Sequence, residues 1–99
     1  MSLVVEGERG TITVTSATLA SLVTQAVERV DGARVRRGRR GIDVEVDGGR
    51  ARVTLDLAAR YGEILPELAR HVQEEVTDAL ATMCGVVVDA VDVEVEEIE

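Results

Sequence analysis

The chain has 99 residues, 45% of them hydrophobic, and a formal net charge of −8. This length suits one domain built around a single core, and the hydrophobic fraction argues against a disordered chain. The negative charge makes nucleic acid and anionic lipid poor main partners, and a single cysteine excludes an internal disulfide framework.

Residues 1–9 are predicted to be a short N-terminal tail. They carry neither the basic region nor the long apolar run of a signal peptide. No stretch of the chain approaches the ~18 apolar residues that cross a bilayer. We therefore expect one domain over residues 10–97, no direct membrane insertion, and a cytoplasmic location, with the membrane reached only through a partner.

The first strand and helix follow this tail. Residues 11–14 alternate, which predicts a half-buried strand with Ile12 and Val14 facing inward. Thr15 or Ser16 is expected to cap the next helix, and an Asp-Gly pair is expected to end it. The apolar stripe of this helix is Leu19, Leu22, Val23, Ala26, Val27 and Val30.

A β-hairpin is predicted next. Residues 42–47 alternate between apolar and acidic side chains, and the Asp-Gly-Gly at 47–49 favours a tight turn because glycine tolerates positive φ. The inward residues of the return strand are Val53, Leu55, Leu57 and Ala59. Between the first helix and this hairpin, residues 33–36 could begin a strand, whereas residues 38–41 indicate a loop.

A second helix and a last strand complete the chain. The helix begins near Glu63, with Pro66 in its first turn, and ends at Gly85. Its apolar stripe is Leu65, Leu68, Ala69, Val72, Val76, Ala79, Leu80 and Met83. In the strand that starts at Val86, the residues on one face are Val91, Val93 and Val95, and those on the other are Asp92, Glu94 and Glu96.

The predicted element order is βαββαβ. Each helix has one apolar stripe and each strand has one apolar face, so both helices should cover one face of a four-stranded, mostly antiparallel sheet. This is an α+β two-layer sandwich, and right-handed crossovers favour the split βαβ arrangement of the ferredoxin-like group. The strand order stays open.

Short motifs along the chain are similar to one known family. They are residues 10–14 (GTITV), 30–33 (VDGA), 61–62 (YG) before a helix with Ile64, Pro66, Val72, Gln73 and Val76, then 83–86 (MCGV) and 91–95 (VDVEV). In order and spacing they resemble the bacterial alkaline shock protein family, also called envelope stress response proteins. The resemblance spans roughly residues 9–96.

The resemblance implies a biological context. Members of that family are non-enzymatic cytoplasmic proteins that support cell-envelope stress tolerance. They resemble self-associating scaffolds, and some reach the membrane through a separate anchor protein. We therefore expect a homo-oligomer that binds a partner protein, with no catalytic residues and no cofactor.

Charge is distributed unevenly along the chain. Residues 34–40 hold five arginines, whereas residues 72–99 hold nine acids and no arginine. Acids on an edge strand block edge-to-edge aggregation, but they could also meet the arginine-rich turn of a neighbouring molecule in a head-to-tail contact that grows into a filament. The candidate protein-contact residues are Arg36, Arg37, Arg39, Arg40, Asp92, Glu94 and Glu96.

Other interpretations of the polar residues are weaker. The GRRG at 38–41 mimics the backbone clamp of KH modules, but that clamp joins two helices, and the expected open sheet face lacks aromatic residues that stack RNA bases. Glu67, His71 and Glu75 share one exposed helix face without a closed ligand shell, so we expect no metal site. Cys84 lacks a neighbouring base and is expected to fill space.

A small-molecule-sensing module of the ACT type is the alternative function. Such modules share the βαββαβ order and bind metabolites near a glycine-lined first strand-to-helix turn. Here residues 14–17 are Val-Thr-Ser-Ala, without glycine, which counts against that alternative.

Overall fold

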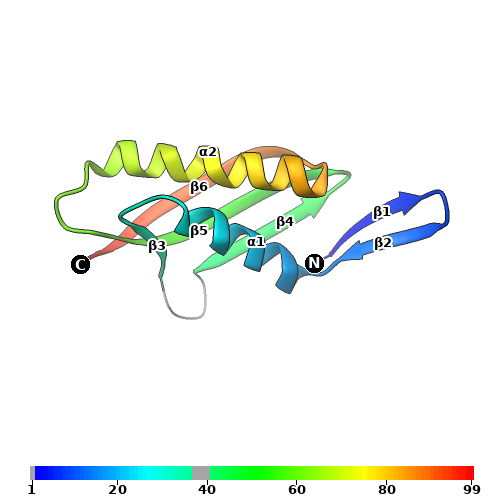
Figure 1. Cartoon of the computed structure of the whole chain (residues 1–99), viewed down its shortest axis with the longest axis horizontal. Helices are drawn as coiled ribbons and strands as arrows, with labels where there is room; N and C mark the ends of the chain where they lie inside the picture. Colours follow the sequence, from blue (N-terminus) through cyan, green and yellow to red (C-terminus); the bar gives the residue numbers. More distant parts are fainter. Residues whose placement is uncertain (1, 37–40) are drawn as a thin grey trace.

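The computed structural model of the protein describes residues 2–36 and 41–99. Within these ranges the chain forms two helices, α1 (Ser16–Glu28) and α2 (Leu65–Cys84), and six strands (Figure 1). The strands are β1 (Leu3–Gly7), β2 (Gly10–Val14), β3 (Ala33–Val35), β4 (Ile42–Asp47), β5 (Arg50–Ala59) and β6 (Val87–Ile98).

β5 is the central strand of the main sheet. β3 and β4 pair antiparallel with one edge of β5, one after the other, and β6 pairs parallel with the other edge. The N–H of Arg36 donates to the carbonyl of Asp56 at 2.8 Å, and the N–H of Asp56 donates to the carbonyl of Gly41 at 2.9 Å. β3 and β4 are therefore two halves of one edge, interrupted between residues 36 and 41.

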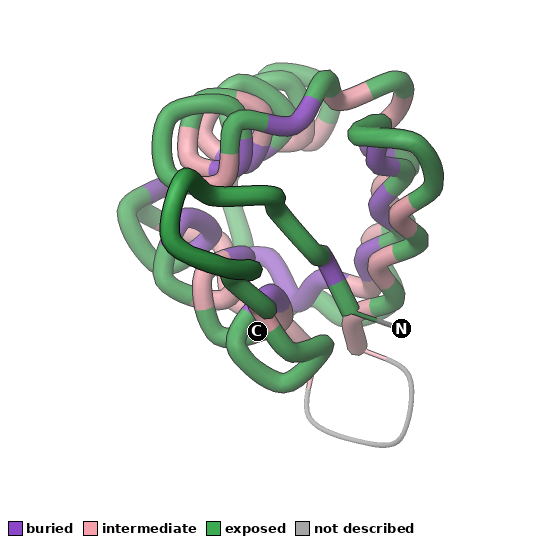
Figure 2. The backbone as a smooth tube through the Cα atoms, turned by 90° about the vertical axis from the view of Figure 1, so that its right-hand side faces the viewer, coloured by how far each residue is buried: buried purple, intermediate pink, exposed green. Residues whose placement is uncertain are grey.

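α1 and α2 lie side by side on one face of this sheet (Figure 2). α1 packs against β3 and β4, and α2 packs against β6. Within the described residues every buried side chain is hydrophobic. The largest fully buried ones are Leu19, Val23, Val27, Val53, Leu55, Leu57, Val72, Val76 and Leu80. The predicted α+β class, with two helices and a mostly antiparallel sheet, is confirmed.

Local signals set the start of α1 and both ends of α2 close to where the sequence predicts them, whereas α1 ends at Glu28, three residues before the predicted Asp-Gly pair. The side-chain oxygen of Thr15 accepts a hydrogen bond from the N–H of Thr18 and caps α1. Pro66 lies in the first turn of α2, where its missing N–H costs no helical hydrogen bond. Gly85 ends α2 with a φ of 67°, a left-handed conformation that favours glycine.

The N-terminal region differs from the prediction. Residues 3–7 form β1 rather than part of a tail, and β2 pairs with β1 in a separate two-stranded sheet instead of joining the main one. The physical reason is local: a short Gly7–Gly10 turn closes at little entropic cost, while β5 and β6 pair directly and leave no place between them. Ile12, expected to face inward, is consequently 58% exposed.

Two further side chains depart from the expected pattern. Met83, placed on the apolar stripe of the second helix, is exposed in the last turn of α2. Leu22, placed on the stripe of the first helix, is only half-buried. Both lie at the margin of the apolar stripe of their helix. Periodicity shows which side of a helix faces the core, but not how much of that side the rest of the fold covers.

Candidate interaction surface

The second face of the main sheet carries the charged side chains. Because successive side chains of a strand point to opposite faces, β5 presents Arg50, Arg52, Thr54 and Asp56 away from the helices, and these are exposed or half-exposed. β4 and β6 add their acids to the same face. We call this surface the charged face.

Two arginines reach across the charged face from one edge to the other. Nε of Arg34, in β3, donates to Oε1 of Glu99 at 2.6 Å. Nε of Arg36 donates to Oε1 of Glu97 at 2.9 Å, and Nη1 of Arg36 also pairs with Glu96. These pairs tie the C-terminal end of β6 to β3 across the central strand.

Two further pairs link β5 to β6. Arg50 makes two hydrogen bonds to Asp89, one of them from Nε to Oδ2 at 3.0 Å, and Nε of Arg52 lies 3.6 Å from Oδ2 of Asp92. The register of β6 on β5 shifts at two places, next to Asp89 and next to Glu96. At each bulge β6 has one additional residue, Asp89 at the first and Glu96 at the second, and the bulge changes the direction of its side chain. Asp89 pairs with Arg50, and Glu96 pairs with Arg36.

Ala58, a small residue of the central strand β5, lies where the arginines of β3 extend over β5 toward β6. It is paired with Arg34 on one side and with Glu97 on the other, and it is 1% exposed although it faces away from the helices. Ala58 does not belong to the core cluster between the layers. Its burial therefore requires cover from neighbouring side chains of the charged face, where Arg34 and Glu97 flank it, and the stem of a long side chain such as arginine can supply such cover.

The pairs shift the titration of their members. The hydrogen bond from Arg50 lowers the pKa of the Asp89 carboxyl below its ordinary value, and the hydrogen bond from Arg60 lowers that of Asp31. The pKa of the Arg50 guanidinium is raised by the same bond to Asp89. Each charged form is favoured by its partner.

The Asp89→Asn variant should be slightly less stable than the parent at pH 7 and pH 5, and the difference should shrink as the pH falls below the ordinary carboxyl pKa. A lowered folded-state pKa stabilises the fold above the unfolded value of about 4. That contribution is lost as the pH falls through the lowered pKa. Urea unfolding at each pH measures it. Arg50→Gln should lower the free energy of unfolding by as much as Asp89→Asn, and the variant with both changes should lose no more than either one alone. If the two losses add, Asp89 and Arg50 stabilise the fold independently.

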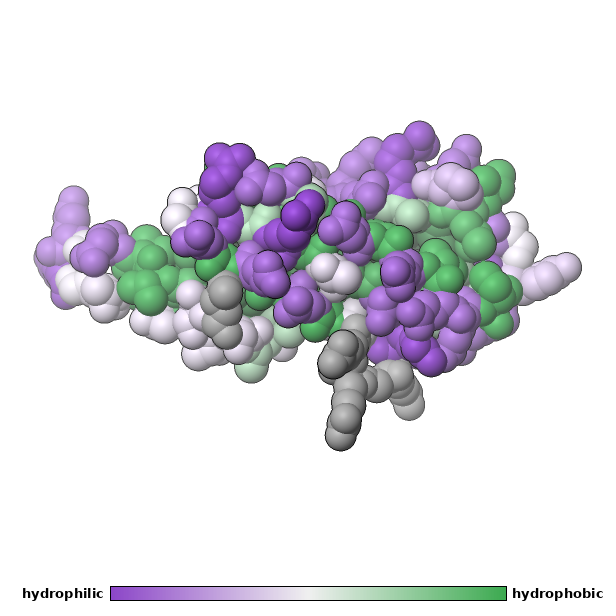
Figure 3. Space-filling view, turned by 180° about the vertical axis from the view of Figure 1, so that it is seen from behind, coloured by the Kyte–Doolittle hydropathy of each residue, from purple (hydrophilic) through white to green (hydrophobic). Residues whose placement is uncertain are grey.

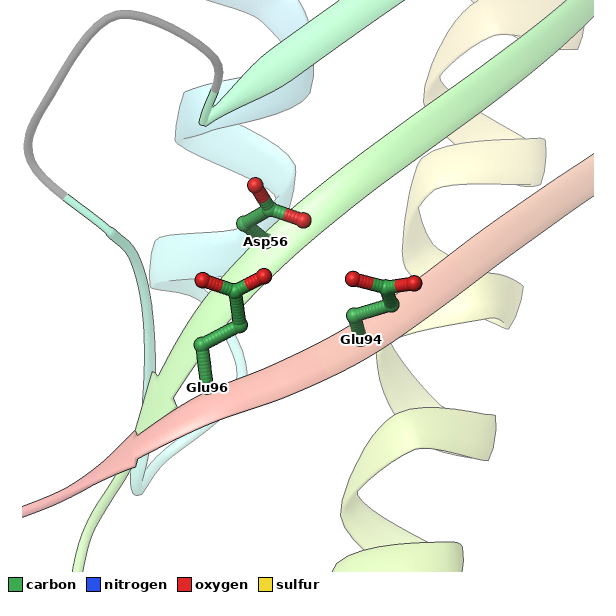
Figure 4. Close-up of side chains that lie close together, drawn as sticks. All are labelled: Asp56, Glu94 and Glu96. Carbon is green, nitrogen blue, oxygen red and sulfur yellow. The ribbon is translucent and has the colours of Figure 1, made fainter.

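Three carboxylates converge in the middle of the charged face (Figure 4). Oxygens of Asp56, Glu94 and Glu96 all lie within 4.8 Å of one another. Carboxylate oxygens suit hard divalent cations, but Glu96 already pairs with Arg36 and the face is open to solvent. The sequence prediction missed this group because β-register alone brings Asp56 beside Glu94.

A shallow depression of about 590 Å³ lies between the end of α1 and the first half of α2. Its polar lining includes Glu67, His71 and Glu75, the residues weighed above as metal ligands. Within the described residues their ligand atoms do not form a group close enough to share a cation. The thiol of Cys84 is partly buried, and burial raises its pKa, as expected for an unreactive thiol.

The candidate contact residues thus divide into groups. Arg36 and Glu96 pair within one chain, and Asp92 pairs with Arg52. Glu94 lies beside Asp56. The other members of the predicted turn, Arg37, Arg39 and Arg40, lie outside the described residues, so a contact between neighbouring molecules through them stays a prediction.

Comparison with known families decides the wider context. Residues 33–99 match the model of the alkaline shock protein family, described by a cell envelope-related function. The chain belongs to the alkaline shock protein family. The matched range covers the main sheet and α2, and the resemblance noted in the sequence is confirmed there. No curated protein matches the chain.

Solved structures similar to this alkaline shock family member carry the same fold. A copper form and a cadmium form of MamM CTD variants are each 18% identical, with a TM-score of 0.58, over 86% of this chain and 100% of that one. A zinc form is 17% identical, with a TM-score of 0.54, over 84% of this chain and 86% of that one. Among the described residues, no helix combines the length and apolar character needed to cross a membrane.

Proposed function

We propose that this protein is a non-enzymatic scaffold that supports the cell envelope by contacting other proteins, foremost further copies of itself. It acts from the cytoplasm and reaches the membrane through a partner protein. The family's envelope-related description supports the context. The observation that carries the proposal is the separation between a wholly hydrophobic described core and ionised side chains that lie on the surface.

This separation bears on catalysis as well as on binding. Catalytic groups are typically titratable side chains in a sheltered pocket with shifted pKa values. Here the acids with a lowered pKa, Asp31 and Asp89, owe it to exposed arginine partners. Exposed ion pairs of this kind contribute little energy each and do not form a sheltered pocket. Such an exposed surface suits a protein whose work is contact.

Sedimentation velocity of the purified protein tests the proposal. The weight-average sedimentation coefficient should rise with protein concentration from the low micromolar to the near-millimolar range, because reversible association follows mass action. A single monomeric species over the whole range, at low and at high salt, would remove self-association from the account.

The ligand-sensing alternative has its own test. A thermal-shift screen with amino acids, nucleotides and divalent cations would raise the unfolding temperature if the folded chain binds one of them. The metals in the titles of the MamM CTD structures make copper, cadmium and zinc part of that screen. A reproducible shift that disappears in Glu94→Gln would favour a sensing role. The scaffold proposal expects no such shift.

A further inference from the structure

β6 is an edge strand of the main sheet. It has 12 residues, and among the described strands it pairs only with β5. The outer side of β6 therefore carries backbone N–H and C=O groups that no strand of the described chain covers. A free edge of this kind is where a further strand can add to a sheet.

The hydrogen bonds of β5 show which groups of β6 point outward. The N–H and the carbonyl of Asp56 both bond toward the β3 and β4 edge, so those of its neighbours Leu55 and Leu57 point toward β6. These two residues are paired with Val93 and Val95 of β6, respectively. In each parallel pair only one member directs its backbone groups at the other strand. The N–H and C=O groups of Val93 and Val95 therefore point away from the sheet.

A side chain of α2 confirms this direction at the preceding position of the alternation. Val91 is paired with Val53, and its carbonyl accepts a hydrogen bond from Nε2 of Gln73 at 3.0 Å. The amide of Gln73 reaches this oxygen because the oxygen points away from β5. Gln73 thus satisfies one outward acceptor of β6, whereas the described contacts give the outward groups of Val93 and Val95 no partner.

The side chains beside this free edge differ between its two faces. On the helix side Val93 and Val95 are half-buried and pack against the core. On the charged face Asp92, Glu94 and Glu96 are exposed at alternate positions. Among the described residues Glu94 makes no ion pair. A strand added here would meet apolar side chains on one face and carboxylates on the other.

We propose that β6 binds an extended segment of a partner protein as an additional strand, and that basic and apolar residues alternate in this segment. The inference rests on the proposed role of contacting a partner protein and gives the chemistry of that partner. Facing side chains of neighbouring strands share a face, so the apolar residues lie beside Val93 and Val95, and the basic ones beside Asp92 and Glu94. In such additions the backbone hydrogen bonds give affinity and the alternate side chains give specificity.

Charge complementarity selects a basic segment rather than a second copy. Residues 72–99 hold nine acids and no arginine, and Figure 3 shows hydrophilic residues gathered at the end of the body away from the hairpin, where β6 ends. Two β6 edges brought together would place acids beside acids, and like charges at facing positions destabilise a strand pair. The β3 strand of a second copy offers Arg34 and Arg36, but these already pair with acids of their own chain.

Hydrogen exchange measured by NMR tests the contact on the unchanged protein. The probe is a capped peptide of about seven residues in which arginine and valine alternate, long enough at about 3.3 Å per residue to follow residues 91–97. Saturating peptide should slow the exchange of the Val93 and Val95 amides at least about tenfold. The amides of Asp92 and Glu94, which face β5, should slow less. A peptide of the same composition with its arginines and valines in two blocks is the control and should change none of these rates.

N-methylated peptides separate strand pairing from simple charge attraction. Alternate N–H groups of an added strand face β6, so methylation of all valines or of all arginines removes either every facing donor or none of them. One of the two methylated peptides should bind at least about tenfold more weakly than the unmethylated one in isothermal titration, and the other should bind equally well. If both or neither of them binds, no strand is added.

Two pairs of variants test the edge from the side of the protein. Proline has no N–H, and the ladder to β5 does not use the N–H of Val93, so an edge strand tolerates Val93→Pro. This variant should bind the alternating peptide at least about tenfold more weakly, and its control Val93→Ala less than about threefold more weakly. At low salt Glu94→Gln should weaken binding about threefold. Asp43→Asn makes the same change of charge on the exposed side of β4 and should leave binding unchanged.

The outcomes separate this contact from self-association. A protein that stays monomeric but binds the alternating peptide at β6 would remove self-association and keep the strand addition. Unchanged exchange at Val93 and Val95, equal binding of the alternating and the block peptide, or loss of self-association in Val93→Pro would each overturn the strand addition, the last by assigning the edge to a second copy. If circular dichroism shows that Val93→Pro does not fold, the two peptide experiments decide, because they use the unchanged protein.

Discussion

Replacement of Leu55 by alanine should lower the free energy of unfolding by about 3 kcal/mol, since it removes a buried side chain and leaves a cavity. Leu55 is fully buried in the central strand β5 and belongs to the cluster between the sheet and the helices. Urea unfolding followed by circular dichroism measures the loss.

Thr54 provides the matched control for this substitution. It is the preceding residue of β5 and is exposed on the charged face. Thr54→Ala should lower the free energy of unfolding by at most about 1 kcal/mol, the strand preference that alanine lacks. Similar losses for the two variants would contradict the assignment of the two faces of β5, and with it the position of the core.

Enlargement of Ala58 to leucine should cost about 2 kcal/mol, because the added atoms have no room at a packed position. Ala58 is 1% exposed and lies between Arg34 and Glu97 on the charged face. The larger side chain must push the side chains that cover Ala58 off the sheet. Urea unfolding again gives the magnitude, and Thr54→Leu on the same face should cost much less.

A double-mutant cycle identifies the cause of that loss. If the stem of Arg34 covers Ala58, Ala58→Leu should be less harmful in an Arg34→Ala background, and the two effects should not add. Strict additivity would mean that Ala58 is buried by something other than the crossing arginine.

The secondary structure between residues 42 and 85 follows from local patterns. β4 and β5 alternate with period two around a glycine turn, with φ values of 56° at Gly48 and 76° at Gly49, and α2 carries apolar residues at helical spacing between Pro66 and Gly85. Short-range signals of this kind need no knowledge of the tertiary fold. The layer arrangement follows from them because each element has a single apolar face.

The N-terminal hairpin is the part of the fold that was predicted wrongly, since β1 was expected to be a tail and β2 a strand of the main sheet. Leu3 and Val5 alternate with their neighbours, and the segment between Gly7 and Gly10 has the length of a hairpin turn. Those signals were present but short, and the expectation of a βαββαβ order assigned β2 to the main sheet. Pairing between adjacent strands prevailed because it closes the shorter loop.

The network on the charged face could not be predicted from sequence. The partners Arg34 and Glu99 are 65 residues apart, and Arg50 and Asp89 are 39 apart. Their meeting depends on the parallel register of β6 and on its two bulges, which no local pattern encodes. Arg36 and Glu96 meet inside one chain, whereas the predicted contact of these acids with the arginine turn of a neighbouring molecule stays a prediction.

Photo-crosslinking in the native cell tests most directly the claim that this protein acts by contacting further copies of itself. With a photoreactive amino acid placed in turn at exposed positions of the charged face and of the hairpin, irradiation should capture mainly a second copy of the chain. Mass spectrometry of a differentially isotope-labelled pair of copies separates such links from links within one molecule. Capture of only monomer, or links confined to one molecule, would contradict the account.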